Sequence, residues 1–335
     1  MPTNSRELVR ALFAGKPVSR PPFIPYMATA AAQFMQVPVK QMFSDPTTLA
    51  NSLQACQRLF KYDGVAVLLD TTLEAEALGC QISWEEKEPP KVVSHILSEG
   101  KDPESLDIST IETKGRIPVV LEAAKRLSQT VGRDVAMLGL VTGPMTFSKH
   151  LLGDDFAYAM DINSQLSLKL FTLWGKIALA LARAYGELKF DAVVLADKDL
   201  ASLFPVHYPK IQPILKTMRN LVNYYDAPLI ILTNCVPQVP VDRFTAFLRF
   251  EADGFSLGNP VADIKNISLP SGKLLGRCIS RTILLGSTEG VENAVSELFD
   301  KGNRFFVTSD WEVPAATPPV NLHKVMHMLT IARVK

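Results

Sequence analysis

Eight short runs of aliphatic and β-branched residues recur along this 335-residue chain, and they constrain its fold more than any other feature. Each run is apolar almost throughout, whereas a strand with one face in water alternates apolar and polar residues, so both faces must be buried. Amphipathic helical patterns separate most of the runs. This alternation of eight strands with helices favours an α/β fold of the (β/α)8 TIM-barrel type over an open doubly wound sheet. The runs cover residues 23–27, 64–70, 134–142, 191–197, 227–234, 253–259, 273–278 and 303–309.

The spacing of the runs predicts two additions to a plain barrel. Asn4 can cap an N-terminal helix, with Glu7 three residues later as in a capping box. Roughly 60 residues separate the second run from the third, and this charged, proline-containing stretch predicts an insertion at about 71–110. The sequence has no Gly/Ser linker and no internal repeat, so we expect one barrel domain over 1–335.

Charge and cysteine content exclude several classes of partner. Lys and Arg total 35 and Asp and Glu total 34, so nothing in the overall charge favours nucleic acid or anionic lipid. No stretch approaches the roughly 20 apolar residues that span a bilayer, and the charged N-terminus does not resemble a signal peptide. Four cysteines without a C-x-x-C pair fit a reducing compartment. We therefore expect a soluble cytoplasmic protein with free thiols, which binds neither nucleic acid nor a membrane.

The residues that follow the strands of such a barrel form its active site, at the C-terminal face. Here they include acids, amides, a thiol and a guanidinium. Adjacent strand residues point to opposite faces, so at most one of Asp197 and Lys198 is expected to enter the barrel mouth. The strand-end residues are Met27, Asp70, Glu74, Glu76, Thr142, Gly143, Asp197, Lys198, Asp199, Thr233, Asn234, Cys235, Asn259, Arg277, Cys278, Ser309 and Asp310.

Several familiar chemistries have no motif in this sequence. It contains no P-loop, no G-x-G-x-x-G after the first strand, no G-x-S-x-G elbow and no H-E-x-x-H helix. Nucleotide binding through those loops, and hydrolysis through those triads or zinc helices, are therefore disfavoured. Among the five histidines, His95 and His150 remain open as functional residues.

Longer stretches of the sequence resemble one known family over essentially the whole chain. They include RELVRALFAGKPVSRPP, LEAEALGC, GLVTGPMTFSKHLLG and FDAVVLADKDLAS. Together they resemble the uroporphyrinogen decarboxylase superfamily, which implies a TIM barrel. The superfamily contains true decarboxylases of heme synthesis and also methyltransferases that work with a corrinoid-carrying protein.

The first strand end distinguishes these two branches. Decarboxylases carry an arginine-rich R-Q-A-G-R type motif there, which grips the propionates of the tetrapyrrole, whereas this chain reads MATAAAQFM. Asp70 matches the aspartate that decarboxylases place after the second strand to bind pyrrole N–H groups. An aspartate that caps the next helix would explain Asp70 equally well.

LEAEALGC resembles the methyltransferase branch, which implies candidate zinc ligands. Thiol methyltransferases of this branch hold zinc with H-x-C after the fifth strand and a cysteine after the eighth, and the zinc activates the acceptor thiol. Here the fifth-strand motif reads Thr233-Asn234-Cys235 and the eighth reads Ser309-Asp310, which leaves Cys235 and, as an oxygen ligand, Asp310. Ether-cleaving members use E-x14-E-x20-H; Glu74 and His95 match its second half, but Leu59 stands at its first position.

The resemblance therefore predicts a methyltransferase that moves a methyl group from a small methylated donor, such as an aryl methyl ether, to the cobalt of a separate corrinoid protein. The expected partners are that protein and the donor; a homodimer is left open. Two alternatives also remain: a uroporphyrinogen decarboxylase, and a non-catalytic accessory that binds a corrinoid or a partner. The predicted site residues are Asp70, Glu74, Asp197 and Asn234 for catalysis, Met27, Trp311 and Arg277 for the cofactor, and Cys235, Asp310, Glu74 and His95 for zinc.

Overall fold

The computed structural model of this chain describes residues 4–160, 165–200, 206–234, 247–258, 272–299 and 305–331. Its main sheet is parallel and follows the order β1-β4-β5-β6-β7-β8-β9. Each strand of this sheet coincides with one of the apolar runs, although β8 extends one residue beyond its run, so the predicted α/β barrel architecture is confirmed. The strands are β1 (Gly64–Ala66), β4 (Ala136–Thr142), β5 (Ala192–Ala196), β6 (Leu229–Asn234), β7 (Gly254–Gly258), β8 (Leu274–Ile279) and β9 (Phe305–Ser309).

The remaining apolar run, at 23–27, lies between the two edges of this sheet. It pairs with β9 at a parallel bridge between Phe23 and Val307, and the amide of Ile24 donates to the carbonyl of Val307 at 2.8 Å. On its other side, the amide of Asp63 donates to the carbonyl of Phe23 at 2.8 Å. This segment therefore closes the barrel as its eighth strand position, although only isolated bridges form there.

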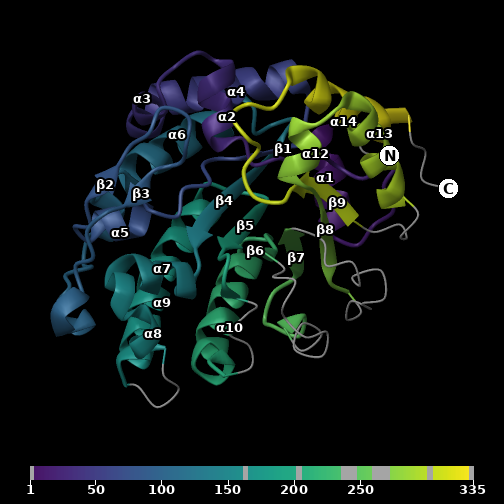
Figure 1. Cartoon of the computed structure of the whole chain (residues 1–335). Helices are drawn as coiled ribbons and strands as arrows, with labels where there is room; N and C mark the ends of the chain where they lie inside the picture. The colour runs from purple at the N-terminus through teal and green to yellow at the C-terminus, as the bar shows by residue number, and fades with distance from the viewer. Residues whose placement is uncertain are drawn as a thin grey trace.

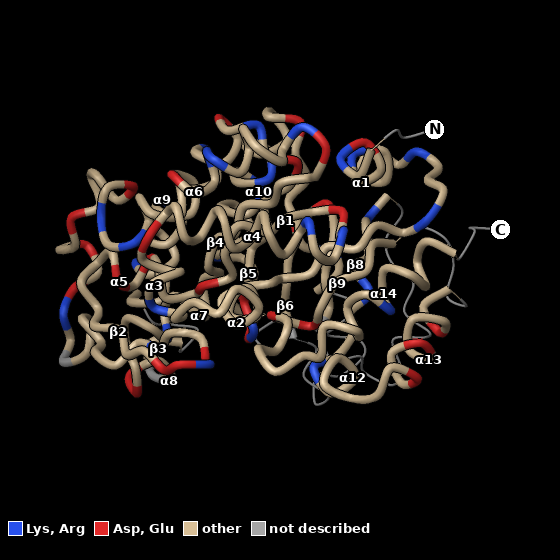
Figure 2. The backbone as a smooth tube through the Cα atoms, turned by 90° about the horizontal axis from the view of Figure 1, so that it is seen from above, with Lys and Arg blue, Asp and Glu red and all other residues tan. Residues whose placement is uncertain are grey.

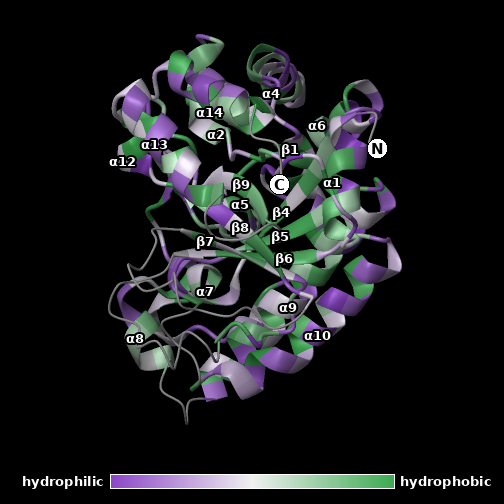
Figure 3. Cartoon of the chain, turned by 90° about the vertical axis from the view of Figure 1, so that its right-hand side faces the viewer, coloured by the Kyte–Doolittle hydropathy of each residue, from purple (hydrophilic) through white to green (hydrophobic). Residues whose placement is uncertain are grey.

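Helices cover the outside of the barrel (Figure 1). Among these, α9 packs on β4, α10 on β6 and α13 on β8, while α14 contacts both α13 and α4. Figure 3 shows the central strands mostly in the hydrophobic colour and the outer helices in mixed colours. The helices include α1 (Ser5–Phe13), α2 (Ala28–Phe34), α3 (Val39–Ser44), α4 (Pro46–Phe60), α6 (Ile117–Thr130), α7 (Pro144–Leu152), α9 (Gln165–Glu187), α10 (Tyr208–Tyr224), α12 (Arg281–Leu285), α13 (Thr288–Phe299) and α14 (Pro319–Ile331).

Local signals set where several of these helices begin. The side chain of Asn4 accepts from the amide of Glu7 at 2.9 Å, so the cap expected at the N-terminal helix is present. Asp45 caps α4 in the same way by accepting from the amide of Thr48 at 2.6 Å. Such caps satisfy amides that have no partner within the helix. In the described part of the chain, no helix combines the length and the apolar character needed to cross a membrane.

The stretch that follows β1 leaves the barrel before returning to it. It holds the short helix α5 (Leu73–Ala77), an antiparallel pair of two-residue strands β2 (Ile82–Ser83) and β3 (Lys91–Val92), and three short 3-10 turns (Ser98–Gly100, Pro103–Ser105 and Ile111–Thr113). This agrees with an excursion at about 71–110. That the whole chain forms one domain stays a prediction.

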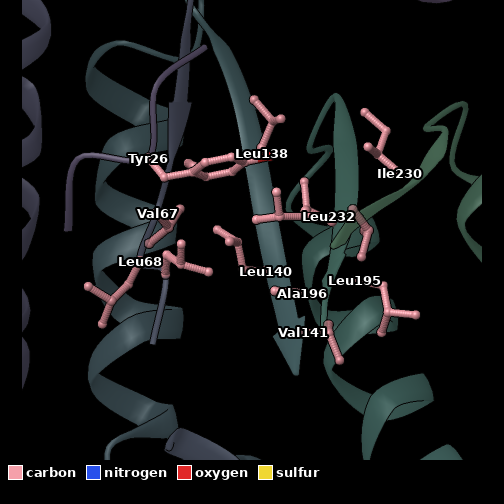
Figure 4. Close-up of a cluster of buried hydrophobic side chains, with 14 of the residues drawn as sticks. Tyr26, Val67, Leu68, Leu138, Leu140, Val141, Leu195, Ala196, Ile230 and Leu232 are labelled. Carbon is pink, nitrogen blue, oxygen red and sulfur yellow. The ribbon is translucent and has the colours of Figure 1, made fainter. Parts of the chain in front are cut away.

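Aliphatic side chains from neighbouring strands fill the core. Figure 4 shows Tyr26, Leu138, Leu140, Leu232 and others gathered from the closing segment and strands β4 to β6. Leu138 and Leu232 are at most 1% exposed. Because packing of this kind depends on continuous burial, the apolar runs found in the sequence correspond to the barrel wall.

A buried carboxylate, Asp63, joins the closing segment to β1 and α1. Its two oxygens accept from both terminal nitrogens of Arg20 at 2.7 Å, from the amide of Phe23 at 2.8 Å and from the hydroxyl of Ser5 at 2.7 Å. The carboxylate side chain is fully buried, whereas that of Arg20 is 19% exposed. A charge buried to this extent is tolerated because every oxygen has donors.

We predict that Asp63→Ala lowers the free energy of unfolding by about 3 to 5 kcal/mol, because it leaves Arg20 without its partner at a partly buried position. Urea unfolding measures this. Glu122→Ala is the matched control, since it breaks the exposed pair between Glu122 and Arg126 and should leave stability nearly unchanged. Equal effects of the two substitutions would contradict the role assigned to Asp63.

Candidate active site

Polar side chains from several strand ends meet at the C-terminal end of the barrel, as the fold requires. Those that organise it are Asp70 after β1, Thr142 at the end of β4, Asp197 and Lys198 after β5, and Trp311 after β9. In Figure 2, acidic and basic positions are interspersed around the periphery, and the central strands carry few of either. The site is therefore argued from individual pairs of residues rather than from a surface of one charge.

Asp70 is held in an ion pair inside the protein. Its Oδ2 accepts from Nη1 of Arg116 at 2.5 Å, and its Oδ1 accepts from the amide and the hydroxyl of Thr72 at 2.9 and 2.7 Å. Arg116 also donates to Glu76 at 2.6 Å and lies over the ring of Trp84, 4.7 Å from its centroid. Asp70 therefore stabilises the turn into α5 and forms a buried ion pair, and both of its oxygens have protein donors.

Glu74 is buried and hydrogen-bonded to the end of β4. Its Oε1 accepts from the amide of Thr142 at 2.8 Å, and its Oε2 accepts from the Thr142 hydroxyl at 2.5 Å. The carbonyl of Thr142 accepts from the indole of Trp174 at 2.7 Å, which fixes this residue from a second side. Burial raises the pKa of Glu74 to about 7, and the two bonds from Thr142 oppose that rise. Glu74 can therefore hold or release a proton near neutral pH.

Asp197 caps helix α7 from the neighbouring strand. Its Oδ2 accepts from the amide of Met145 at 2.8 Å and its Oδ1 from the hydroxyl of Thr146 at 2.9 Å. Gly143 makes this approach possible, because a Cβ at that position would lie 2.3 Å from the Cβ of Asp197. Burial outweighs these donors and raises the pKa of Asp197 to about 7.

Lys198 extends in another direction and reaches the far side of the mouth. Its Nζ lies 4.8 Å from the centre of the Trp311 ring, a cation–π contact between the end of β5 and the segment after β9. These strands stand opposite each other in the order of the barrel, with the closing segment counted between β9 and β1. Asp197 and Lys198 thus diverge, as their adjacent positions in the sequence suggest.

Two histidines lie together between α7 and the excursion after β1. Nδ1 of His95 lies 2.9 Å from the carbonyl oxygen of His150, and Nε2 of His150 lies 3.4 Å from the hydroxyl of Thr71. The ring of His95 fills the space beside Gly153, where a Cβ would lie 2.4 Å from it. Burial lowers the pKa of His150 to about 4, so its ring is neutral at pH 7.

Other residues predicted for the site lie outside this group. Met27 is 1% exposed and belongs to the core where α2 begins. Arg277 faces the helical layer, where it donates to the carbonyl of Leu298 and lies 4.0 Å from the centre of the Phe305 ring. The strand end suggested a position at the mouth for Arg277, but alternation along β8 sends its side chain to the opposite face from Cys278. Arg277 therefore points away from the mouth, and Met27 is part of the core.

The candidate zinc ligands do not form a metal site in the part of the chain that the structure describes. Within those residues, no group of three or more His, Cys, Asp or Glu side chains is arranged to hold a metal ion. Both oxygens of Glu74 accept bonds from Thr142, Nδ1 of His95 lies against the carbonyl of His150, and Oδ2 of Asp310 accepts from the amide of Arg281 at 3.2 Å. Cys235 lies outside the described residues. The described donors therefore do not fit a zinc ion.

The site positions of Asn234 and Asn259 stay predictions. Asn234 ends β6, opposite Gly258, and its side chain lies outside the described residues, as does Asn259. The expected free thiols are present at the described cysteines, Cys56, Cys80 and Cys278.

Sequence reasoning missed Arg116 and Glu312. Arg116 lies 46 residues beyond Asp70, and only the path of the excursion brings the two together. Glu312 lies two residues beyond Asp310; extending the search past each strand end by a few residues would have included it. The hydroxyl and amide of Thr29 donate to Oε2 of Glu312 at 2.9 and 3.2 Å.

A pH-dependent stability is expected from Asp197. Its pKa is about 7 in the folded chain and 3.8 as its ordinary value, so the folded state holds a proton that the unfolded state releases between these pH values. The stability contributed by the protonated group is therefore lost as pH rises from about 4 to 7. Relative to Asp197→Asn, the wild type should lose as much as about 4 kcal/mol over this range.

Urea unfolding of both proteins at pH 4.5, 6 and 8 measures this difference. Other carboxyl groups are common to the two proteins and cancel. If the difference in unfolding free energy did not change with pH, or moved in favour of the wild type as pH rose, Asp197 would be ionised in the folded protein over the whole range.

Comparison with known proteins places this chain in a family. A family profile described as uroporphyrinogen decarboxylase (URO-D) matches residues 4–330. The chain belongs to the uroporphyrinogen decarboxylase family, as the motifs predicted. Two solved structures share the fold. A methyltransferase from Methanosarcina mazei has a TM-score of 0.85 at 20% identity over 98% of each chain. A B12-independent methionine synthase from Shewanella sp. W3-18-1 has a TM-score of 0.56 at 14% identity over 85% of this chain and 87% of that one.

Relatives with assigned activities are methyltransferases. Methylcobamide:CoM methyltransferase MtbA of Methanosarcina acetivorans is 27% identical over 199 residues, 58% of either chain. Methylcobamide:CoM methyltransferase MtaA of Methanosarcina barkeri is 26% identical over 203 residues, 56% of either chain. The matched region thus spans little more than half the length of these relatives.

Proposed function

We propose that this chain is a corrinoid-dependent methyltransferase, which moves a methyl group between a small methylated molecule and the cobalt of a separate corrinoid protein. The observation that carries the proposal is the state of Asp70. The Asp70 side chain is 1% exposed and is bonded to Arg116 and Thr72, so it is held inside the protein rather than presented to pyrrole N–H groups as a decarboxylase requires.

The first strand end gives independent support. The helix α2 that follows it begins ATAAA, and Ala28, Ala30, Ala31 and Ala32 are at most 1% exposed. Residues 27–35 contain no lysine or arginine, so this segment lacks the guanidinium groups with which decarboxylases grip propionates. The methylcobamide:CoM methyltransferases among the relatives support the same choice.

The buried acids supply what the leaving group needs. Methyl transfer to cobalt breaks the bond between the methyl carbon and its heteroatom, and the heteroatom must then take up a proton. A carboxyl with a pKa near 7 can deliver one at neutral pH. We assign this role to Glu74, since burial raises its pKa to about 7 and Thr142 fixes its orientation.

Trp311 supplies an aromatic wall at the mouth. Its ring contacts the ammonium group of Lys198, and the residue is partly exposed, so a flat ligand at the mouth could pack beside this pair. A corrinoid ring carried by a partner protein is such a ligand. Aryl methyl ethers are one class of donor that fits the same proposal; a homodimer and a cytoplasmic location stay predictions.

Incubation of the purified chain with a reduced corrinoid protein and a panel of methylated donors tests the proposal. We expect methylcobalamin to form with at least one donor, detected by its visible spectrum. Turnover of uroporphyrinogen with release of carbon dioxide would replace the proposal by the decarboxylase alternative. Binding of the corrinoid protein without turnover of any donor would favour the accessory alternative.

Glu74→Gln should lower the rate of methyl transfer on the order of 10²-fold or more, because the amide keeps the shape of the side chain and cannot supply a proton. Glu122→Gln on the exposed face of α6 is the control with the same chemical change. Single-turnover rates of methylcobalamin formation measure both. An unchanged rate in Glu74→Gln would remove Glu74 from the mechanism and leave the proposed reaction standing.

A further inference from the structure

A pocket of about 260 Å³ lies between α2 and the segment that follows β9, at the C-terminal end of the barrel. No residue lining it was predicted for the site, and the proposed methyl transfer does not use it. Thr29 and Glu312 form its inner part, and Ala315 and Ala316 form an apolar part of its wall. At about 30 Å³ for each water molecule in the liquid, this space suits a ligand of roughly eight or nine heavy atoms.

The carboxyl of Glu312 is the chemical centre of the pocket. The residue is 8% exposed, and both donors of Thr29, its amide and its hydroxyl, bind the same oxygen, Oε2. Among the described residues, Oε1 has no hydrogen-bond donor and no cation within salt-bridge distance. A carboxylate buried this deeply ordinarily has donors on both oxygens, so one acceptor position is left for a ligand.

Charges of both signs surround this acceptor. Lys87 and Arg281 line the pocket as exposed residues, and Glu88 lines it as well. The side chains of Lys87 and Arg281 form no salt bridge within the described part of the chain. Two acids and two cations therefore face the space, with an acid at its buried end and both cations at exposed positions.

A ligand with a single charge would satisfy only half of this arrangement. An amine would bind Oε1 of Glu312 but would meet Lys87 and Arg281 at the opening. A carboxylate would pair with the guanidinium of Arg281 in the bidentate geometry that arginine favours, but would then approach Glu312. A small molecule that carries both groups places each next to its opposite.

We propose that this pocket binds a small zwitterion of amino-acid size, with its ammonium group on Oε1 of Glu312 and its carboxylate toward Arg281 and Lys87. The short apolar wall at Ala315 and Ala316 accommodates the carbon skeleton between them. The inference is independent of methyl transfer, since it concerns binding to the chain alone.

Isothermal titration of the purified chain with L-alanine, β-alanine and 4-aminobutanoate tests the proposal, because these probes differ in the separation of their charges. Ethylamine, propylamine, propanoate and butanoate serve as ligands with one charge. We expect at least one zwitterion to bind tenfold or more tightly than the amine and the acid of comparable length. The proposal would be overturned if none of the three zwitterions bound, or if each bound no more tightly than the amine and the acid of comparable length.

Two variants then locate the site. Glu312→Gln should weaken binding of the zwitterion at least tenfold, since an amide offers a donor where the ammonium needs an acceptor. Arg281 is exposed, so Arg281→Gln does not put folding at risk. This variant should bind the zwitterion at least fivefold more weakly and bind the amine with unchanged affinity. Glu122→Gln is the matched control and should bind as the wild type does.

Thermal unfolding of each variant shows whether it is folded. A folded Glu312→Gln that binds like the wild type would place the ligand elsewhere and overturn the assignment. Should Glu312→Gln fail to fold, Arg281→Gln decides alone: unchanged zwitterion binding in that variant overturns the proposal. None of these measurements contains a corrinoid, so their failure and the failure of methyl transfer are distinguishable.

Discussion

The carboxylate of Asp63 holds the barrel closed at the point where its wall is weakest. The closing segment at 23–27 makes only isolated bridges with β9, so its position depends on contacts at its start. Asp63 provides them through Arg20, the amide of Phe23 and Ser5, which links the segment to β1 and to the N-terminal helix. Once the wall is closed, the ends of all strands point to one mouth, and residues distant in sequence can act on one ligand.

The carboxyl groups near that mouth differ in their partners. Asp70 is paired with the guanidinium of Arg116 inside the protein. Glu74 and Asp197 have only neutral donors, so burial dominates and raises the pKa of each to about 7. One strand-end motif, LEAEA with the Asp70 that precedes it, thus supplies both a structural ion pair and a group able to exchange protons.

The partners of the charged groups at the mouth also distinguish this chain from a decarboxylase of its own family. A site for an anionic tetrapyrrole needs guanidinium groups facing the mouth and an aspartate free to accept pyrrole N–H groups. Here α2 begins with buried alanines, and Arg116, which binds Asp70, lies within the protein against Trp84. The charges that remain near the mouth are of both signs, which suits small ligands better than a molecule with many carboxylates.

The sequence by itself determined the barrel, the N-terminal cap at Asn4, the excursion after β1 and the family, because continuous apolar runs and short capping motifs are read locally. It also predicted Glu74 and Asp197 as site residues, since both come after apolar runs. Only the tertiary structure decided which acid is paired. Arg116 and Asp70 are 46 residues apart, Glu312 and Thr29 are 283 apart, and Arg277 turns outward through the alternation of β8. Ionisation depends on burial and on partners brought together by the fold, and no local pattern in the sequence encodes either.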